Sequence, residues 1–234
     1  MPWNIIRLER TASTMEDAAP HPPGTVVVAG EQTAGQGRMG RQWHSEKGGG
    51  LYFSAVMALP CPPEQLPVVT LALGLAAQDA IQRVTGAACD LKWPNDVLAG
   101  GLKCAGILTQ LHGDRIVCGI GVNVNQPGFP DELREIATSL RIVAGREFEK
   151  EELLEASLGA IGEYGELLRE EGRDPILRLF TQSSSWVHGR SVIVDSAGAA
   201  IAGTTCGLDE SGFLWIRADD GRRHLIRAGG VRAR

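Results

Sequence analysis

The sequence predicts an α/β fold in which helices flank a largely antiparallel sheet, followed by a small β-barrel at the C-terminus. Two segments, 66–84 and 150–171, carry apolar residues at helical spacing. Between them, residues 89–124 alternate short apolar runs with turn residues, a pattern typical of a β-meander. After Trp186 the chain consists of short β-rich runs, which predict the barrel.

The elements before this core can be placed from local signals. Ser13 and Glu16 have the spacing of a capping box, so a short helix is predicted to begin there and to stop before Pro20. Residues 25–29 then predict a buried strand, and residues 51–59 predict a second one. The sheet is therefore expected to begin before the first long helix.

Glycine and proline residues predict where the later helices begin and end. Gly86 is expected to end the helix at 66–84, and Asp174-Pro175 offers an N-cap and a first-turn proline for another short helix. The barrel is expected to include strands at 191–194, 213–217 and 223–227, with turns at 196–198 and 220–221.

Length and composition limit the class of protein. The chain has 234 residues, which suits one large domain with a small appendage, and we expect domains at 1–185 and 186–234. Hydrophobic residues make up 43% and charged residues 22%, which argues against wholesale disorder. The net charge is −5 and the basic residues are scattered, which disfavours non-specific nucleic-acid binding.

The chain carries no signal for export or membrane insertion. Its most apolar stretch, 66–77, is shorter than the roughly 20 residues of a spanning helix, and the N-terminus lacks the order of a signal peptide. The 5 cysteines have no CxxC spacing, which favours reduced thiols. We therefore expect a cytoplasmic protein.

A glycine-rich segment at 35–40 matches G-x-G-x-x-G, but its context excludes a dinucleotide-binding loop. Such a loop runs directly into a helix, whereas three consecutive glycines at 48–50 and a strand follow here. The segment instead offers a flexible backbone that can approach a ligand, with Arg38 and Arg41 able to bind phosphate oxygens. The alternative is a surface turn whose arginines are solvated.

Three further segments carry candidate chemistry. Residues 92–96 (KWPND) place a cation, an aromatic ring, a bend and two polar residues together. Lys103 lies among small and apolar residues, so it either reaches water or meets an anion. Residues 119–125 (GIGVNVN) alternate glycine with β-branched residues, which suggests a close approach to that face or a tight strand crossing.

Together these segments resemble the biotin protein ligase family, the enzymes that attach biotin to a lysine of carboxylase carrier domains. The similar segments are 13–15 (STM), 32–43 (QTAGQGRMGRQW), 92–96 with 103–108 (KCAGIL), and 119–125. The resemblance implies a catalytic domain with a mixed sheet and an SH3-like C-terminal barrel. Because the first segment begins at residue 13, we expect the form without an N-terminal DNA-binding domain.

The resemblance implies a reaction in two steps. Biotin and MgATP would give biotinyl-5′-AMP and pyrophosphate, after which a lysine of a biotin carboxyl carrier protein attacks the mixed anhydride. Bringing a carboxylate to the α-phosphate requires positive charge, for which Arg38 and Lys103 are the candidates. Asp96 would orient or deprotonate the incoming lysine. The 5 histidines show no ligand spacing, so only Mg²⁺ travelling with ATP is expected.

The resemblance also implies two binding sets. Biotin binding is assigned to Ser13, Thr14, Met15, Gln32, Gly35, Gln36, Gly37, Arg38, Lys103, Gly106, Gly119 and Gly121. ATP binding is assigned to Arg38, Arg41, Trp43, Asn95, Lys103 and Asn123. Within these sets Trp43 would cover the adenine, and Gly119 and Gly121 would give the biotin ring room against the sheet.

Some positions depart from the commonest family pattern, and other functions stay open. Met15 stands where Asn is frequent and Gln36 where Arg is frequent, which removes a polar contact and a cation.

The alternatives are a lipoate or octanoate enzyme of the same fold, with Cys104 as candidate nucleophile, a non-catalytic biotin or nucleotide-binding module, and a Rossmann oxidoreductase. The expected partner is the carrier domain of a carboxylase, and a homodimer is plausible.

Overall fold

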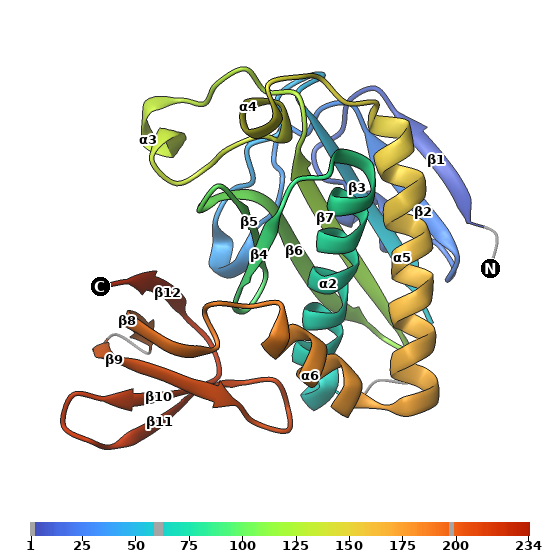
Figure 1. Cartoon of the computed structure of the whole chain (residues 1–234). Helices are drawn as coiled ribbons and strands as arrows, with labels where there is room; N and C mark the ends of the chain where they lie inside the picture. Colours follow the sequence, from blue (N-terminus) through green and yellow to red (C-terminus); the bar gives the residue numbers. More distant parts are fainter. Residues whose placement is uncertain (1–2, 59–62, 197–198) are drawn as a thin grey trace.

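A mixed sheet of 7 strands forms the centre of the molecule (Figure 1). This computed structural model describes residues 3–58, 63–196 and 199–234. In sheet order the strands are β1 (Asn4–Leu8), β2 (Thr25–Ala29), β3 (Gly50–Met57), β7 (Arg115–Asn123), β6 (Leu102–His112), β5 (Asp96–Ala99) and β4 (Cys89–Lys92). The β1–β2 pair is parallel and the other pairs described in this sheet are antiparallel, so the predicted sheet type and meander are confirmed.

Helices cover both faces of this sheet. On one face α2 (Leu66–Thr85) and α5 (Lys150–Glu171) lie side by side (Figure 1). The short α1 (Thr14–Ala18) packs on β2, β3 and β7 in a separate apolar cluster on the other face. Gly86 ends α2 in the left-handed region at φ 71°, which glycine adopts without strain. The remaining helices are α3 (Asp131–Arg134), α4 (Leu140–Ala144) and α6 (Arg173–Gln182).

A second, antiparallel sheet of 5 strands follows α6. In sheet order its strands are β11 (Arg223–Ile226), β10 (Leu214–Ala218), β9 (Ala199–Leu208), β8 (His188–Ser196) and β12 (Gly230–Ala233). Within the described residues β11 and β12 form the two edges and do not pair, so a closed barrel is not seen. The predicted β-rich texture is confirmed, but β9 and β12 were not predicted.

The two sheets share one continuous apolar core, which includes residues of α2 as well as of β8 and β10. Hydrogen bonds also join the second sheet and its linker to the central sheet. Trp93 Nε1 donates to the carbonyl oxygen of Gly212 in the β9–β10 loop over 2.9 Å, and Ser184 Oγ, in the linker between α6 and β8, donates to that of Leu91 over 2.5 Å. The C-terminal sheet therefore contacts the turn between β4 and β5 directly.

Several local predictions need correction. The helix α1 forms where the capping box predicted it, but Ser13 makes no capping bond, and Glu16 accepts instead from Gln36 Nε2 over 2.7 Å. The helix α6 begins at Arg173, one residue before the predicted N-cap. Leu59 and Cys61, and the turn predicted at 196–198 beyond Ser196, lie outside the described residues.

The structure also bears on the expectations about membrane insertion and disulfides. No helix among the described residues is long and apolar enough to cross a membrane. No disulfide forms among the cysteines that the structure describes.

Candidate active site

A cavity of about 680 Å³ opens over β6 and β7 of the central sheet and extends to the C-terminal sheet. Side chains from α1, the 36–44 loop, the β4–β5 turn, β6, β7, the loop before α4 and the C-terminal sheet line it. All the residues assigned to catalysis, biotin binding or ATP binding line this cavity except Ser13 and Gly35. Cys104, the candidate nucleophile of the lipoate or octanoate alternative, is fully buried and does not line it. The structure therefore brings residues that are far apart in the chain into one hollow.

Two paired glycines and a tryptophan form the floor of the cavity. Gly106 of β6 lies opposite Gly121 of β7. A Cβ atom added at Gly121 would lie 2.5 Å from the Trp43 ring, and one added at Gly106 would lie 2.8 Å from it. The indole therefore covers the sheet where side chains are missing, so the close approach predicted for Gly121 is made by a residue of this chain.

Lys103 and Asp96 form an ion pair inside the cavity. Lys103 Nζ lies 2.5 Å from Asp96 Oδ1, and the two side chains are 30% and 22% exposed. The same ammonium lies 5.1 Å from the centroid of the Trp43 ring, within cation–π range. The lysine predicted to meet an anion thus contacts a carboxylate of the chain itself.

Arg38 reaches the same group from the glycine-rich loop. Its Nη1 donates to Asn95 Oδ1 over 3.3 Å, while Asn95 Nδ2 donates to the carbonyl oxygen of Ile107 over 2.9 Å. Burial lowers the pKa of the Arg38 guanidinium, and the neighbouring Asp96 carboxylate acts in the opposite direction. Arg38 and Lys103, the two predicted catalytic cations, therefore converge beside one carboxylate.

Polar side chains line the end of the cavity near α1. Gln32 Oε1 accepts from the Thr14 backbone N–H over 2.9 Å and from Thr14 Oγ1 over 3.1 Å, and Gln32 Nε2 donates to Ser45 Oγ over 2.9 Å. Thr14 Oγ1 also lies 2.8 Å from Ser54 Oγ. This network fixes an amide and a hydroxyl group where an uncharged polar ring could exchange hydrogen bonds with them.

Met15 and Gly119 form an apolar surface beside that network. A Cβ atom at Gly119 would lie 2.6 Å from Met15 Sδ, so the glycine makes room for the thioether. Met15 is 4% exposed and packs with Val27, Val56 and Val117. The room expected at Gly119 is therefore occupied in part by this methionine.

Ser13 and Gly35 lie outside the cavity lining. Ser13 is fully buried, and its Oγ has no hydrogen-bond partner among the described residues. Gly35 accepts from the Trp43 backbone N–H over 2.8 Å, and a Cβ atom there would lie 2.8 Å from the Trp43 carbonyl oxygen. Gly35 therefore allows the two arms of the loop to pair, instead of contacting the cavity.

Asn123 lines the cavity but uses its amide within the protein. Its Nδ2 donates to the carbonyl oxygen of Thr138 over 3.0 Å, and Thr138 in turn donates its N–H to the Lys103 carbonyl oxygen over 2.9 Å. Asn123 thereby fastens the loop before α4 to the strand that carries Lys103. The sequence identified this asparagine as a ligand contact but not as a support of the loop.

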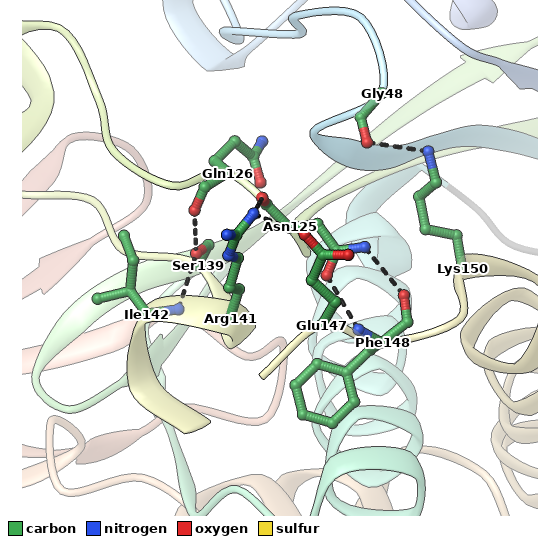
Figure 2. Close-up of polar contacts among 9 residues, drawn as sticks. All are labelled: Gly48, Asn125, Gln126, Ser139, Arg141, Ile142, Glu147, Phe148 and Lys150. Atoms are coloured by element: carbon green, nitrogen blue, oxygen red, sulfur yellow. Dashed lines mark hydrogen bonds and ion pairs between the residues drawn. The ribbon is translucent and has the colours of Figure 1, made fainter. Parts of the chain in front are cut away.

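A second set of hydrogen bonds joins this loop to the segment after β7 (Figure 2). Ser139 Oγ donates to the Gln126 carbonyl oxygen over 2.7 Å and accepts the N–H of Ile142 over 3.1 Å, which caps α4. Asn125 exchanges two bonds with the backbone of Phe148, of 2.9 and 3.0 Å. The segment after β7 is therefore fixed to the start of α5.

The C-terminal sheet supplies a wall that sequence reasoning missed. Trp186 and Arg190 line the cavity, and the charged ends of Lys92 and Arg190 each lie 4.6 Å from the centroid of the Trp186 ring. Burial lowers the pKa of Lys92, with Asp96 acting in the opposite direction. A lysine inside the KWPND motif was the available signal, but its partner lies about 90 residues later in the chain.

The cavity as a whole favours an anionic ligand. Its lining contains 6 Lys and Arg side chains, namely Arg38, Arg41, Lys92, Lys103, Arg190 and Arg232. The acidic side chains in the lining number 3, namely Asp96, Glu135 and Asp195. An excess of positive charge in a partly enclosed hollow attracts polyanions such as a triphosphate.

Comparison with known proteins identifies relatives of the chain. Residues 6–125 match the model of the biotin/lipoate A/B protein ligase family. The chain is 34% identical over 230 residues to the bifunctional ligase/repressor BirA of Bacillus subtilis, covering 94% of this chain and 70% of that protein. It is 32% identical to the biotin–[acetyl-CoA-carboxylase] ligase of Paracoccus denitrificans, covering 94% of this chain and 97% of that protein.

A solved structure matches over almost the full chain. The biotin protein ligase from Aquifex aeolicus in complex with biotin and ATP superposes with a TM-score of 0.88 at 32% identity. The match covers 99% of both chains, so it includes the C-terminal sheet as well as the central one.

Proposed function

The chain belongs to the biotin/lipoate A/B protein ligase family, and from that premise we propose that it is a biotin protein ligase. It uses ATP to attach biotin to a lysine of a biotin carboxyl carrier domain, through biotinyl-5′-AMP. The observation that carries this proposal is the convergence of Arg38 and Lys103 on one cavity. Relatives that are named as such ligases support it.

The first step joins two anions, which sets the electrostatic requirement. A biotin carboxylate oxygen bonds to the α-phosphorus of ATP, and pyrophosphate leaves. Lys103 and Arg38 supply fixed positive charge where charge builds up on the phosphorus oxygens. To contact a phosphate, Lys103 must share its ammonium with Asp96 or leave it.

Binding of biotin involves the polar and apolar surfaces near α1. Thr14 and Gln32 offer hydrogen bonds to the ureido ring, and Met15 beside Gly119 offers apolar contact to the rest of the ring system. Trp43 lies over Gly106 and Gly121. When the loop that carries it shifts, its indole leaves this position and covers the bound ligand. Such closure excludes water from the reactive anhydride.

The second step transfers the biotinyl group to a carrier lysine. The lysine nitrogen attacks the carbonyl carbon of the anhydride, and AMP leaves with the bridging oxygen. If Lys103 moves onto phosphate, Asp96 becomes available to orient the incoming ammonium and to accept its proton. Asn95 and Asn123 act mainly on the protein side, since their amides bind Ile107 and Thr138.

Mg²⁺ is proposed as a companion of ATP. The described residues contain no group of three His, Cys, Asp or Glu side chains that could hold a metal ion. The residues present therefore fit an ion that is coordinated mainly by phosphate oxygens and water, as is usual for Mg²⁺. Bound there, it would neutralise phosphate charge.

The finer parts of the architecture are also proposals. We assign residues 1–185 to the catalytic unit and residues 186–234 to an SH3-like barrel unit that completes the cavity. The proposed partner is a carboxylase carrier domain, and the proposed location is the cytoplasm. A homodimer is compatible with these roles.

The decisive experiment uses the purified chain with ATP, biotin and a biotin carboxyl carrier domain. We expect the mass of the carrier to increase by one biotinyl group, and pyrophosphate to be released only when biotin is present. Parallel reactions contain lipoate or octanoate instead of biotin, and a carrier whose acceptor lysine is replaced by arginine serves as control.

A Rossmann oxidoreductase is not supported, because the sheet is largely antiparallel and the chain matches another family. The other two alternatives each have an outcome of their own. Release of pyrophosphate with lipoate but not with biotin would assign the chain to the lipoate branch of the family. Thermal stabilisation by biotin without pyrophosphate release would indicate a binding module.

A further inference from the structure

A smaller cavity of about 280 Å³ opens beside the active-site cavity, and we call it the side chamber. It lies where β6, the first turns of α2 and the C-terminal sheet meet. The two cavities share part of their lining, namely Arg38, Trp93, Pro94, Ile107 and Leu108. The side chamber is therefore a neighbour of the active site with Arg38 in the common wall.

Two arginines from different parts of the chain face the side chamber. Arg38 comes from the glycine-rich loop, and Arg227 follows β11 of the C-terminal sheet. Arg38 donates to Asn95, the Arg227 guanidinium lies 5.7 Å from the centroid of the Phe213 ring, and neither forms an ion pair with a described residue. Arg38 has the Asp96 carboxylate as a neighbour on the side of the active-site cavity, but neither guanidinium is held in an ion pair within the described part of the chain.

The rest of the wall strengthens this charge. Among the described residues no Asp or Glu lines the side chamber. Thr70 and Thr109 contribute hydroxyl groups 2.6 Å apart. The first turn of the 20-residue helix α2 borders the chamber, and apolar side chains such as Leu66 and Leu71 limit the access of water. A phosphoanion would meet two guanidinium groups, the half-buried one of Arg38 and the exposed one of Arg227.

We propose that the side chamber binds inorganic diphosphate, the leaving group of adenylate formation, between Arg38 and Arg227. This inference rests on the proposed function. In that step a carboxylate oxygen of biotin bonds to the α-phosphorus of ATP, and the bond from this phosphorus to the oxygen that bridges to the β-phosphate breaks. Diphosphate departs with that oxygen and the bonding electron pair. Because Arg38 lines both cavities, the anion can enter the side chamber while it keeps this guanidinium as a partner.

The test is a calorimetric titration of inorganic diphosphate into the full chain without biotin or ATP. We compare wild type with Arg227→Gln and with a matched control, Arg223→Gln. Arg223 is also exposed and stacks on an aromatic ring, with its guanidinium 4.7 Å from the Trp215 centroid, but it lines neither cavity. We expect Arg227→Gln to weaken binding roughly tenfold, by loss of one charged hydrogen-bonding group, and Arg223→Gln to change it less than about twofold.

A second measurement follows diphosphate as an inhibitor of adenylate formation. Arg227→Gln should raise the inhibition constant of diphosphate by the same factor. Arg227→Lys should restore part of the lost affinity. Equal diphosphate affinity in wild type and Arg227→Gln, or an equal loss in both variants, would overturn the inference. If wild type forms no adenylate but binds diphosphate through Arg227, the proposed function fails and the anion site stands. If adenylate forms and Arg227 has no influence on diphosphate, the function stands and the site fails.

Discussion

The two walls of the active-site cavity hold their cations in different ways. In the central sheet, Lys103 pairs with Asp96 and Arg38 donates to Asn95, so both are engaged with polar side chains. In the wall formed with the C-terminal sheet, Lys92 and Arg190 stack on the ring of Trp186. In the first pair, Lys103 must share its ammonium with Asp96 or leave it in order to bind an anion, whereas the second pair can bind one and keep its aromatic contact.

This difference suggests separate roles for the two walls. A cation that moves from a protein partner onto the phosphate during the reaction stabilises the charge that builds up on the phosphorus oxygens. This favours a catalytic role for Lys103 and Arg38. Charges that stay on an aromatic support contribute steady attraction to a phosphate chain, which lowers KM without raising kcat. Three changes test this separation, and a fourth, outside both walls, tests the scaffold alone.

The largest effect is expected from Lys103→Ala. Loss of a hydrogen bond to a charged group costs about 1.5 to 3 kcal/mol, so adenylate formation should slow by roughly 10- to 150-fold. Pyrophosphate release with biotin and ATP measures this, and thermal unfolding checks that the fold is intact. A wild-type rate in this variant would remove Lys103 from catalysis.

Gly121→Ala tests the floor of the first wall. The added Cβ atom would lie 2.5 Å from the Trp43 ring, so the indole must move from its place over the sheet. Overpacking of this kind costs about 1 to 3 kcal/mol, and we expect roughly a tenfold loss of kcat/KM for adenylate formation. Gly159→Ala is the control, because no atom lies within 4 Å of the corresponding Cβ position.

Arg190→Gln tests the second wall. Because Arg190 is exposed, the lost attraction is about 0.5 to 1 kcal/mol, and KM for ATP should rise about two- to fivefold while kcat is kept. Arg217→Gln, an exposed arginine of β10 outside the cavity, is the control. A fall in kcat instead would contradict the separation of roles between the walls.

Gly162 lies outside both walls, and its replacement by alanine is expected to give the smallest effect, a small change in the free energy of unfolding. This glycine is inside α5, and an added methyl group meets no atom within 4 Å. Alanine loses less backbone entropy than glycine in a helix, so the free energy of unfolding should rise by about 0.5 to 1 kcal/mol. Chemical denaturation measures it, and adenylate formation should be unchanged.

Much of the central fold could be predicted because its signals are local. The helix at 150–171 and the strand at 25–29 have the bounds that apolar spacing indicated. The strand β9 was missed because AAIAGTTCGL is rich in small residues, and its pairing with β8 and β10 arises from neighbours. The SxxE pattern predicted α1 but not the fate of Glu16, whose partner Gln36 lies in a distant loop.

The candidate site shows the same limit. The sequence identified most of the residues that line the first wall, because they belong to motifs with fixed spacing. It did not identify Trp186 and Arg190, since nothing near them in the chain indicates that Lys92 lies over the same ring. It also suggested that glycines 106 and 121 would face a ligand, whereas Trp43 covers them.

The bond from Trp93 Nε1 to the Gly212 carbonyl oxygen bears on how small a working version of this protein can be made. A chain shortened to end at Ser185 would lose the acceptor of that buried indole, together with Trp186 and Arg190, and Lys92 would lose the ring on which it stacks. Attempts at a minimal enzyme should therefore trim exposed loops and keep the terminal strands, however dispensable an appended sheet looks.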